Sequence, residues 1–523
     1  MPTTYLGLDS STQSLTAVLI DPAARKILHQ ASINYDADLP EYGTTNGVLP
    51  ADDPTLVHAP PLMWVEALDR LLIALRKDGF PVEDIAAISG SGQQHGSVYW
   101  NRAWPSALAS LDPAHPPAGQ LQGALARPTA PIWMDSSTTA ECEEICEALG
   151  GAESTARLTG SSTFERFTGP QIRKFFKEEP DAYANTGPIA LVSSMMCSLL
   201  AGKVAPIDHG DGAGMNLMRI EQKAWYPPAL EATAPGLAQR LPGLVEPWSV
   251  IGPISDYFVQ RYGFAPGTEV IAWSGDNPNS VIGLGLTRPG MVAISLGTSD
   301  TFFGTLEDCR TDPRGEGHLF GSPTGGYMSL ICLKNGSLAR ERVRDMYGLD
   351  WAGFSAALSL APPGNNGKMM LPWFEPEIVP RVLNPGVRRR GLAEDDVPGN
   401  CRAVVESQML SMQIHSAWMD VETECIYATG GASANREILQ VMADVHGCPV
   451  YRSEIGDSAA LGAALRAAHG HLQARNPSIT WDEMVKGFSG PVAGFEIHPT
   501  PETAPVYAKA VKEYQAFEKW EQP

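Results

Sequence analysis

Two aspartates stand at the ends of apolar segments, where the local backbone does not require an acidic side chain. Asp9 ends an apolar run near the N-terminus and is followed by a hydroxyl-rich turn, residues 10–14. Asp276 begins a loop after a second apolar segment, residues 269–273, and precedes Asn277. In open α/β sheets, ligands bind at the carboxyl ends of the strands. Two carboxylates there, with hydroxyls and glycine amides nearby, suit a nucleotide, its Mg²⁺ and a phosphoryl acceptor.

The two carboxylates suit different parts of a phosphoryl transfer. Such a transfer needs neutralisation of the charge on the moving group, and a residue that positions or deprotonates the acceptor hydroxyl. Asp9, beside Ser10, Ser11 and Thr12, is suited to orienting Mg²⁺ directly or through water. Asp276 is suited to accepting the proton of a substrate hydroxyl. The structural alternatives are an acid that caps its own turn for Asp9, and an Asx-turn for Asp276.

Three further places carry groups that bind polar ligands. His95, in a glycine-flanked loop, can hydrogen-bond a polyol hydroxyl, although a single histidine is more often structural. Arg166 can bind a substrate oxygen, or pair with the neighbouring Glu165. Gly430 and Gly431 follow an apolar segment, and would either let a backbone approach an adenine or ribose or form a bare strand–helix turn.

Strand and helix patterns alternate along the chain, which predicts an α/β fold. Apolar segments around a hydroxyl-rich turn predict a β-hairpin over residues 5–20, and the same plan recurs over residues 291–303. One such hairpin in each half predicts a duplicated architecture with two similar lobes. A Pro/Gly-rich stretch, residues 241–253, predicts the domain boundary. We expect helices over residues 60–77, 402–419, 435–445 and 457–468, strands over 85–88, 269–273 and 425–428, and loops over 89–96 and 362–367.

The composition excludes several classes of protein. The 523 residues are 43% hydrophobic and 19% charged, which indicates large cores rather than a disordered chain. The net charge of −21 argues against a partner that is nucleic acid or an anionic membrane, because both need a basic face. We find no stretch as apolar as a membrane span of about 18 residues and no signal-peptide pattern. Eight irregularly spaced cysteines predict reduced thiols in a cytoplasmic protein.

Nine short motifs follow one another in order over about residues 5–470 and cover nearly the whole chain. They occupy residues 7–13, 89–96, 131–137, 165–169, 211–217, 274–278, 295–299, 334–337 and 428–438. Each is a weak signal alone, but the ordered set is specific and resembles the FGGY carbohydrate kinases, within them the xylulokinase branch shared with animals. One position departs from many bacterial relatives, because Gln94 stands where they have Met. The pocket wall is therefore expected to differ from theirs.

The resemblance implies two RNase H-like lobes of the actin-like ATPase superfamily, with the active site in the cleft between them. The expected domains are residues 1–248, a sugar-binding lobe with the first phosphate turn, and residues 249–523, an ATP-binding lobe with the catalytic aspartate. It implies that Asp276 is the catalytic base and that Asp9 organises Mg²⁺. The implied sugar-binding residues are His95, Arg166, Asp276 and Asn277, and the implied ATP-binding residues are Ser11, Thr12, Gln13, Gly297, Thr298, Trp351, Gly430, Gly431 and Asn435.

The resemblance also implies the reaction, which is transfer of the γ-phosphoryl group of Mg·ATP to O5 of D-xylulose. We expect the protein to be a monomer or a homodimer. One alternative is an FGGY kinase for another polyol, such as ribulose, glycerol or gluconate. A second is an actin- or Hsp70-like ATPase that moves a partner, disfavoured because no peptide-binding domain is expected after the lobes. A third, a catalytically inactive sugar sensor, is disfavoured because both Asp9 and Asp276 are present.

Overall fold

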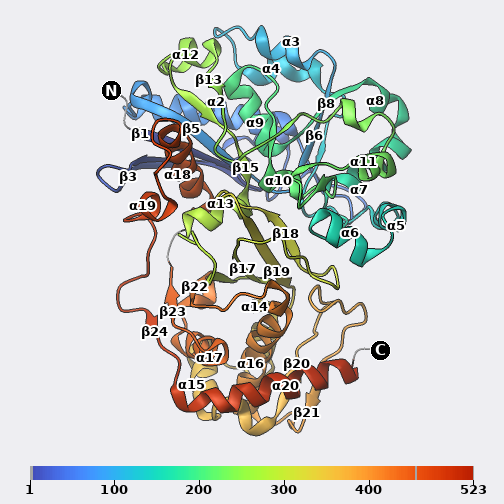
Figure 1. Ribbon diagram of the computed structural model, residues 1–523, viewed down its shortest axis with the longest axis vertical. Coiled ribbons are helices and arrows are strands. Elements are labelled where there is room, and N and C mark those ends of the chain that lie inside the picture. Colours follow the sequence, from blue (N-terminus) through green and yellow to red (C-terminus); the bar gives the residue numbers. More distant parts are fainter. Residues whose placement is uncertain (1–3, 454–455, 522–523) are drawn as a thin grey trace. The chain divides into compact units, whose positions relative to one another are not determined.

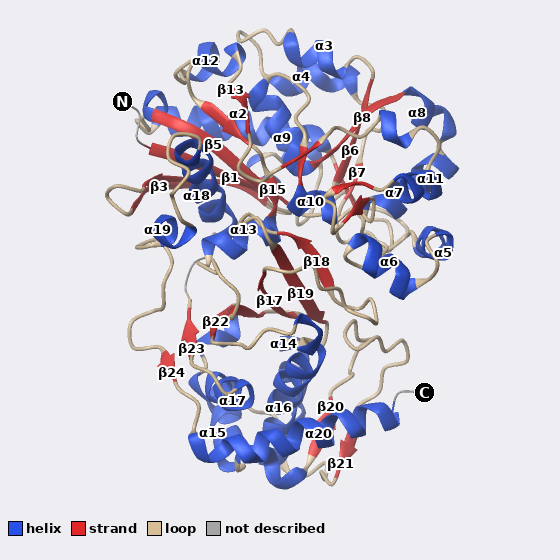
Figure 2. Ribbon diagram, in the orientation of Figure 1, coloured by secondary structure: helices blue, strands red, loops and turns tan. Residues whose placement is uncertain are grey.

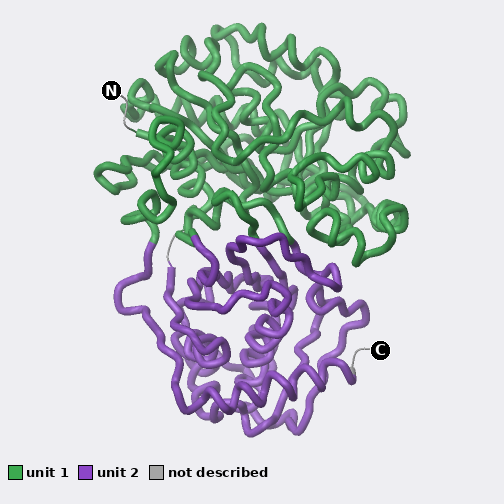
Figure 3. The backbone as a smooth tube through the Cα atoms, viewed as in Figure 1, with its two compact units in different colours: residues 1–287, 319–328, 456–489 green, residues 288–318, 329–455, 490–523 purple. Residues whose placement is uncertain are grey.

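The computed structural model describes residues 4–453 and 456–521, and the chain divides into two compact units (Figure 3). Unit 1 comprises residues 1–287, 319–328 and 456–489, and unit 2 comprises residues 288–318, 329–455 and 490–523. Within the described residues no helix is long and apolar enough to cross a membrane. All eight cysteines are free thiols, as their spacing predicted.

Unit 1 is built on a seven-stranded mixed sheet (Figures 1 and 2). Its main path runs β13-β14-β5-β1-β2-β3, and β15 lies beside β5. The β1–β2 hairpin confirms the one predicted over residues 5–20, and β1 is parallel to β5. The strands are β1 (Thr4–Ser10), β2 (Ser14–Asp21), β3 (Lys26–Asn34), β5 (Ile85–Gly92), β13 (Val250–Pro253), β14 (Glu269–Ile271) and β15 (Ser274–Gly275).

Two helices of unit 1 pack together against this sheet at the position of Asp276. Helix α13 (Asp276–Gly283) begins at Asp276, and α18 (Ser458–Gln473) packs on α13, β1 and β5. The two helices touch backbone to backbone, since a Cβ atom at either Gly283 or Gly462 would lie 1.9 Å from a carbonyl oxygen of the other helix. Only glycine permits this approach, which packs the middle and the end of α13 against α18.

Unit 2 repeats the plan of unit 1. The second sheet has the order β18-β19-β17-β16-β22-β23-β24, and it lies in unit 2 except for residues 319–321 of β18 and 327–328 of β19, which belong to unit 1. In this sheet β16 is antiparallel to β17, and β16, β22 and β23 are mutually parallel. The outer strand is antiparallel in both sheets, β13 in unit 1 and β24 in unit 2. The predicted duplication is therefore confirmed. The strands are β16 (Met291–Leu296), β17 (Asp300–Leu306), β18 (His318–Gly321), β19 (Tyr327–Leu333), β22 (Cys425–Thr429), β23 (Val450–Arg452) and β24 (Glu496–Ile497).

The remaining elements surround these sheets. In unit 2, the long helix α16 contacts α14, α15, α17 and α20. The other elements of unit 2 are α14 (Ser337–Met346), α15 (Trp351–Leu360), β20 (Met369–Leu371), β21 (Arg388–Arg390), α16 (Val397–His415), α17 (Arg436–His446) and α20 (Ala504–Glu521). Those of unit 1 are α1 (Tyr35–Asp38), β4 (His58–Ala59), α2 (Pro61–Lys77), β6 (Ser97–Asn101), α3 (Trp104–Ala109), α4 (Pro117–Leu121), β7 (Ala130–Pro131), α5 (Thr139–Ala148), α6 (Ala152–Thr159), α7 (Thr168–Glu178), α8 (Pro180–Asn185), β8 (Thr186–Leu191), α9 (Val192–Ala201), β9 (Ile207–Asp208), α10 (His209–Ala213), β10 (Met218–Arg219), β11 (Ala224–Trp225), α11 (Pro227–Thr233), β12 (Leu244–Val245), α12 (Asp256–Tyr262) and α19 (Trp481–Val485).

The structure differs from the sequence-based expectations at three places. Strand β5 continues to Gly92, so residues 89–92 are strand rather than loop. Asp276 is the first residue of a helix rather than part of a loop. The division of the chain falls at residues 287 and 288 rather than 248 and 249, because β13 and β14 pair into the sheet of unit 1. Asp276 therefore belongs to unit 1.

Candidate active site

The carboxyl end of β5 brings the two candidate aspartates together. Ser91 of β5 is the register partner of Asp9 on one side and of Ser274 on the other. Ser274 and Gly275 form β15, and Asp276 follows them directly. Asp9 and Asp276 thus flank the same strand end, which is the ligand-binding edge of an open α/β sheet.

Asp276 has one engaged oxygen and one available oxygen. Its Oδ1 accepts hydrogen bonds from the Asn277 backbone (2.8 Å), the Asn277 Nδ2 (3.1 Å) and the Gln94 backbone (3.3 Å). Among the described residues, Oδ2 accepts none. Burial raises the pKa of Asp276 to about 6, against the opposing effect of these hydrogen bonds. A carboxylate held by one oxygen, with a pKa near neutrality, has the properties of a general base.

Asp9 presents an oxygen that the protein does not satisfy. Its Oδ1 is buried without a hydrogen-bond partner, as is Oε1 of Gln93. Burial raises the pKa of Asp9 to about 7, and the charge of Asp276 adds to this. Unsatisfied oxygen atoms of this kind fit Mg²⁺, which binds hard oxygen ligands. Within residues 4–453 and 456–521 there is no cluster of three or more His, Cys, Asp or Glu side chains arranged for a metal, so such an ion would draw further ligands from water and phosphate.

His95 is held in one tautomer beside Arg166. Its Nδ1 lies 2.9 Å from the carbonyl oxygen of Gly214, which can only accept, so Nδ1 carries the proton. Burial and the charge of Arg166 lower the pKa of His95 to about 3. The ring is therefore neutral, and Nε2 is an acceptor for a ligand hydroxyl.

Aromatic rings bring the two basic residues together. The His95 ring stacks on Phe167 at 4.3 Å, and the Arg166 guanidinium lies 5.6 Å from the centre of the same ring and 5.1 Å from that of Phe164. The remaining predicted sugar ligand, Asn277, donates from Nδ2 to Oε1 of Gln94 at 2.9 Å. Unit 1 thus gathers all the predicted sugar-binding residues around the loop that follows β5.

The two predicted phosphate turns occupy equivalent positions in the two sheets. Ser11, Thr12 and Gln13 join β1 to β2, and Gly297 and Thr298 join β16 to β17. In unit 2 the Ser337 backbone N–H donates to the Gly297 carbonyl at 2.9 Å, which ties the turn to the start of α14. Asp300, at the end of the turn, forms a fully buried bidentate ion pair with Arg340 of α14, at 2.6 and 2.9 Å.

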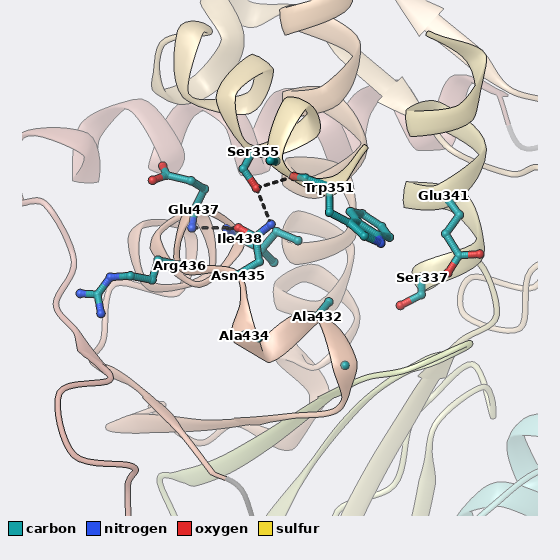
Figure 4. A pocket seen from close by; sticks show the side chains of 12 residues that line it. Ser337, Glu341, Trp351, Ser355, Ala432, Ala434, Asn435, Arg436, Glu437 and Ile438 are labelled. Atoms are coloured by element: carbon teal, nitrogen blue, oxygen red, sulfur yellow. Dashed lines mark hydrogen bonds between the residues drawn. The ribbon is translucent and has the colours of Figure 1, made fainter. Parts of the chain in front are cut away.

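A cavity of about 700 Å³ in unit 2 collects three of the predicted adenosine ligands (Figure 4). Trp351, Gly431 and Asn435 line it, and Figure 4 shows Trp351 between Asn435 on one side and Ser337 and Glu341 on the other. A volume of this size is typical of small-molecule sites.

Gly430, the remaining predicted adenosine ligand, does not line this cavity. Its φ is +81°, and a Cβ atom there would lie 2.6 Å from the carbonyl oxygen of Leu296, so it shapes the turn that presents Gly431.

Asn435 has a structural task as well. Its Oδ1 caps α17 by accepting from the backbone of Glu437 (3.1 Å) and Ile438 (3.2 Å), and its Nδ2 donates to Ser355 at 2.7 Å. One Nδ2 proton remains for a ligand.

Comparisons with known proteins identify the family of this chain. The model of the N-terminal domain of the FGGY family of carbohydrate kinases matches residues 128–283, and that of the C-terminal domain matches residues 292–471. The chain belongs to the FGGY family of carbohydrate kinases. The gap between the two FGGY domains contains the division between the compact units.

Individual relatives support the same family. The chain is 44% identical over 526 residues to "Xylulose kinase" of Mus musculus, covering 98% of this chain and 94% of the mouse protein. It is 45% identical over 491 residues to "Xylulose kinase 2" of Arabidopsis thaliana, covering 90% of this chain and 87% of that protein. The crystal structure of xylulose kinase from Rhodospirillum rubrum matches with a TM-score of 0.82 at 20% identity, covering 99% and 98% of the two chains. The expected α/β fold with two sheet-containing lobes is thereby confirmed as that of FGGY kinases.

Proposed function

We propose that this FGGY kinase transfers the γ-phosphoryl group of ATP to O5 of D-xylulose, giving D-xylulose 5-phosphate and ADP. The observation that carries the proposal is the 44% identity to mouse xylulose kinase over 98% of this chain. The cytoplasm, which supplies ATP and Mg²⁺, is the proposed compartment.

Unit 1 supplies the groups proposed to act on the sugar. Oδ2 of Asp276 is open to accept the O5 proton, since the hydrogen bonds of the carboxylate are made by Oδ1. O5 forms the new bond to the γ-phosphorus, the bond from that phosphorus to the bridging oxygen breaks, and ADP leaves. Neutral His95 accepts from one sugar hydroxyl through Nε2, and Arg166 donates to another sugar oxygen. Asn277 accepts from a sugar hydroxyl through Oδ1, because its two Nδ2 protons are donated to Asp276 and Gln94.

The remaining proposed contacts concern the nucleotide. The turns at residues 11–13 and 297–298 bind phosphates through backbone N–H groups and hydroxyls. Trp351, Gly431 and Asn435 bind the adenosine in the 700 Å³ cavity, with Gly430 forming the turn beside it. Asp9 would hold Mg²⁺, which when bound supplies positive charge to the phosphate oxygens.

The deciding experiment is ADP release by the purified protein with Mg·ATP across a panel of acceptors. The panel contains D-xylulose, D-ribulose, L-xylulose, L-ribulose, glycerol and gluconate, with a control lacking sugar. Fast turnover with D-xylulose and little without sugar is the expected result. Preference for another acceptor would reassign the substrate and place the difference in the pocket around His95 and Arg166. ATP hydrolysis indifferent to every acceptor would refute the sugar-kinase function.

A further inference from the structure

An arginine with no assigned role lies buried beneath the catalytic turn of unit 1. Arg466, in the middle of the Ala/Gly-rich helix α18, is 1% exposed. A buried guanidinium is costly unless its donors are satisfied. Its two terminal nitrogens donate to the carbonyl oxygens of Pro247 (2.8 Å) and Ala272 (3.0 Å), to Oδ2 of Asp208 (3.3 Å) and to Oδ1 of Asn279 (3.1 Å), whereas Nε has no partner among the described residues.

Two of these acceptors hold the residues that immediately precede Asp276. Oδ1 of Asp208 accepts from the hydroxyl of Ser274 at 2.9 Å. Nδ2 of Asn279 donates to the carbonyl oxygen of Gly275 at 2.8 Å. Arg466 therefore orients both side chains that fix the backbone leading into the catalytic carboxylate.

The same network extends toward His95. Oδ1 of Asp208 also accepts from the backbone N–H of Asp211 at 2.9 Å, and the Asp211 carbonyl accepts from the backbone of Gly214 at 3.0 Å. The carbonyl of Gly214 in turn holds Nδ1 of His95. One buried arginine thus supports the base and, through Asp208, the group that sets the tautomer of His95.

We propose that Arg466 is a positioning residue for the transfer step, which holds Asp276 and the turn beneath His95 without touching either substrate. The proposal rests on the proposed role of Asp276 as the base. We expect substitution of Arg466 to lower kcat and to leave KM for ATP little changed, because the nucleotide cavity lies in unit 2 and shares no residue with this network.

The test compares Arg466→Lys with the double variant Arg466→Met/Asp208→Asn, which removes both buried charges and so avoids leaving Asp208 unpaired. Arg475→Met is the matched control, since Arg475 is an exposed arginine just beyond the same helix that pairs with Glu269. We expect the double variant to lose about 10- to 100-fold in kcat, with KM for ATP changed less than about twofold. Arg466→Lys should lose less kcat than the double variant does. The control should match the wild type. The acidic limb of kcat/KM should move to higher pH, since misplaced N–H donors no longer favour the charged form of Asp276.

A double-mutant cycle separates positioning from general structural damage. In an Asp276→Asn background, the Arg466 and Asp208 substitutions should cost less than about threefold further, because the group they position is already gone. The full loss repeated in that background, or a change only in Tm or in KM for ATP, would overturn the proposal. If the protein phosphorylates another sugar of the panel but not D-xylulose, only the substrate assignment is overturned. The double-mutant cycle is then measured with that sugar. If no sugar is accepted, the pH dependence of unfolding reports Asp276 directly, and an unchanged profile in the double variant refutes positioning.

Discussion

Replacing Asp276 by Asn is expected to stabilise the folded protein while removing most of its activity. The carboxylate is buried enough to raise its pKa from 3.8 to about 6, so its charged form is disfavoured in the fold. Asn keeps the size of the side chain, and its oxygen can still accept from Asn277 and Gln94. The substitution therefore removes a buried charge without removing the hydrogen bonds around it.

The magnitude follows from the difference between the two pKa values. A change of one pKa unit corresponds to about 1.4 kcal/mol, so the free energy of unfolding of the wild type is lowered by at most about 3 kcal/mol once Asp276 is fully charged. Between about pH 4 and pH 6 the folded state binds the proton more tightly than the unfolded state, so this cost grows as the pH rises through that window and is constant above it. Because the side chain is only partly buried, we expect a gain of about 1–2 kcal/mol for Asp276→Asn at pH 7.5 and a smaller gain at pH 5.

The assay is chemical unfolding of the wild type and Asp276→Asn at both pH values, together with sugar-dependent ADP release. Loss of a general base is expected to lower kcat by about 10²–10⁴-fold. Asp52→Asn, at an exposed loop aspartate, is the control and should change neither quantity. A stability gain of equal size at pH 5 and pH 7.5 would refute the raised pKa, and kcat near that of the wild type would refute the role of Asp276 as base.

Three further outcomes are expected. His95→Ala and Arg166→Ala should each raise KM for the sugar at least about tenfold with KM for ATP little changed in steady-state kinetics, and an effect confined to ATP would contradict their placement. Trp351→Ala should raise KM for ATP several-fold and leave KM for the sugar unchanged, whereas the opposite pattern would remove Trp351 from the adenosine site. Arg340→Met leaves Asp300 buried without its partner and should lower the free energy of unfolding by about 3–5 kcal/mol in urea, while Arg340→Met/Asp300→Asn should cost distinctly less. Equal costs for the single and double variants would show that the ion pair is not the source of the loss.

Local signals in the sequence predicted the hairpins and most helices correctly. The β1–β2 and β16–β17 hairpins carry short apolar runs around hydroxyl-rich turns, so a short window contains the whole signal. Strand β5 shows where this reasoning ends, because its last residues are glycine and serine, which disfavour strands. Gly90 in this strand is needed for packing, since a Cβ atom there would lie 2.1 Å from the Trp273 ring. Tertiary packing therefore overrides the local preference there.

The sequence named the candidate site residues, whose roles stay predictions, but it gave no sign of the contacts that tune them. The motif containing His95 suggested a sugar ligand, but its tautomer depends on Gly214, which lies 119 positions away. Arg466 gave no signal, because the Ala/Gly composition of α18 indicated only close packing. Its partners Asn279 and Asp208 lie 187 and 258 positions away in the sequence. No local pattern reports pairings at that separation.

The two candidate carboxylates of unit 1 are held in a state that water would not favour. Asp9 and Asp276 have raised pKa values, so at neutral pH the charged form of each carboxylate carries a free-energy cost that relaxation toward solvent would relieve. Relaxation requires the backbone that carries Asp276 to move, and α13 is prevented from moving by its contact with α18 at Gly283 and Gly462. The small residues of α18 therefore help to hold the backbone that carries Asp276 in place. Close packing of α13 against α18 therefore limits how far this partly buried carboxylate can move toward water.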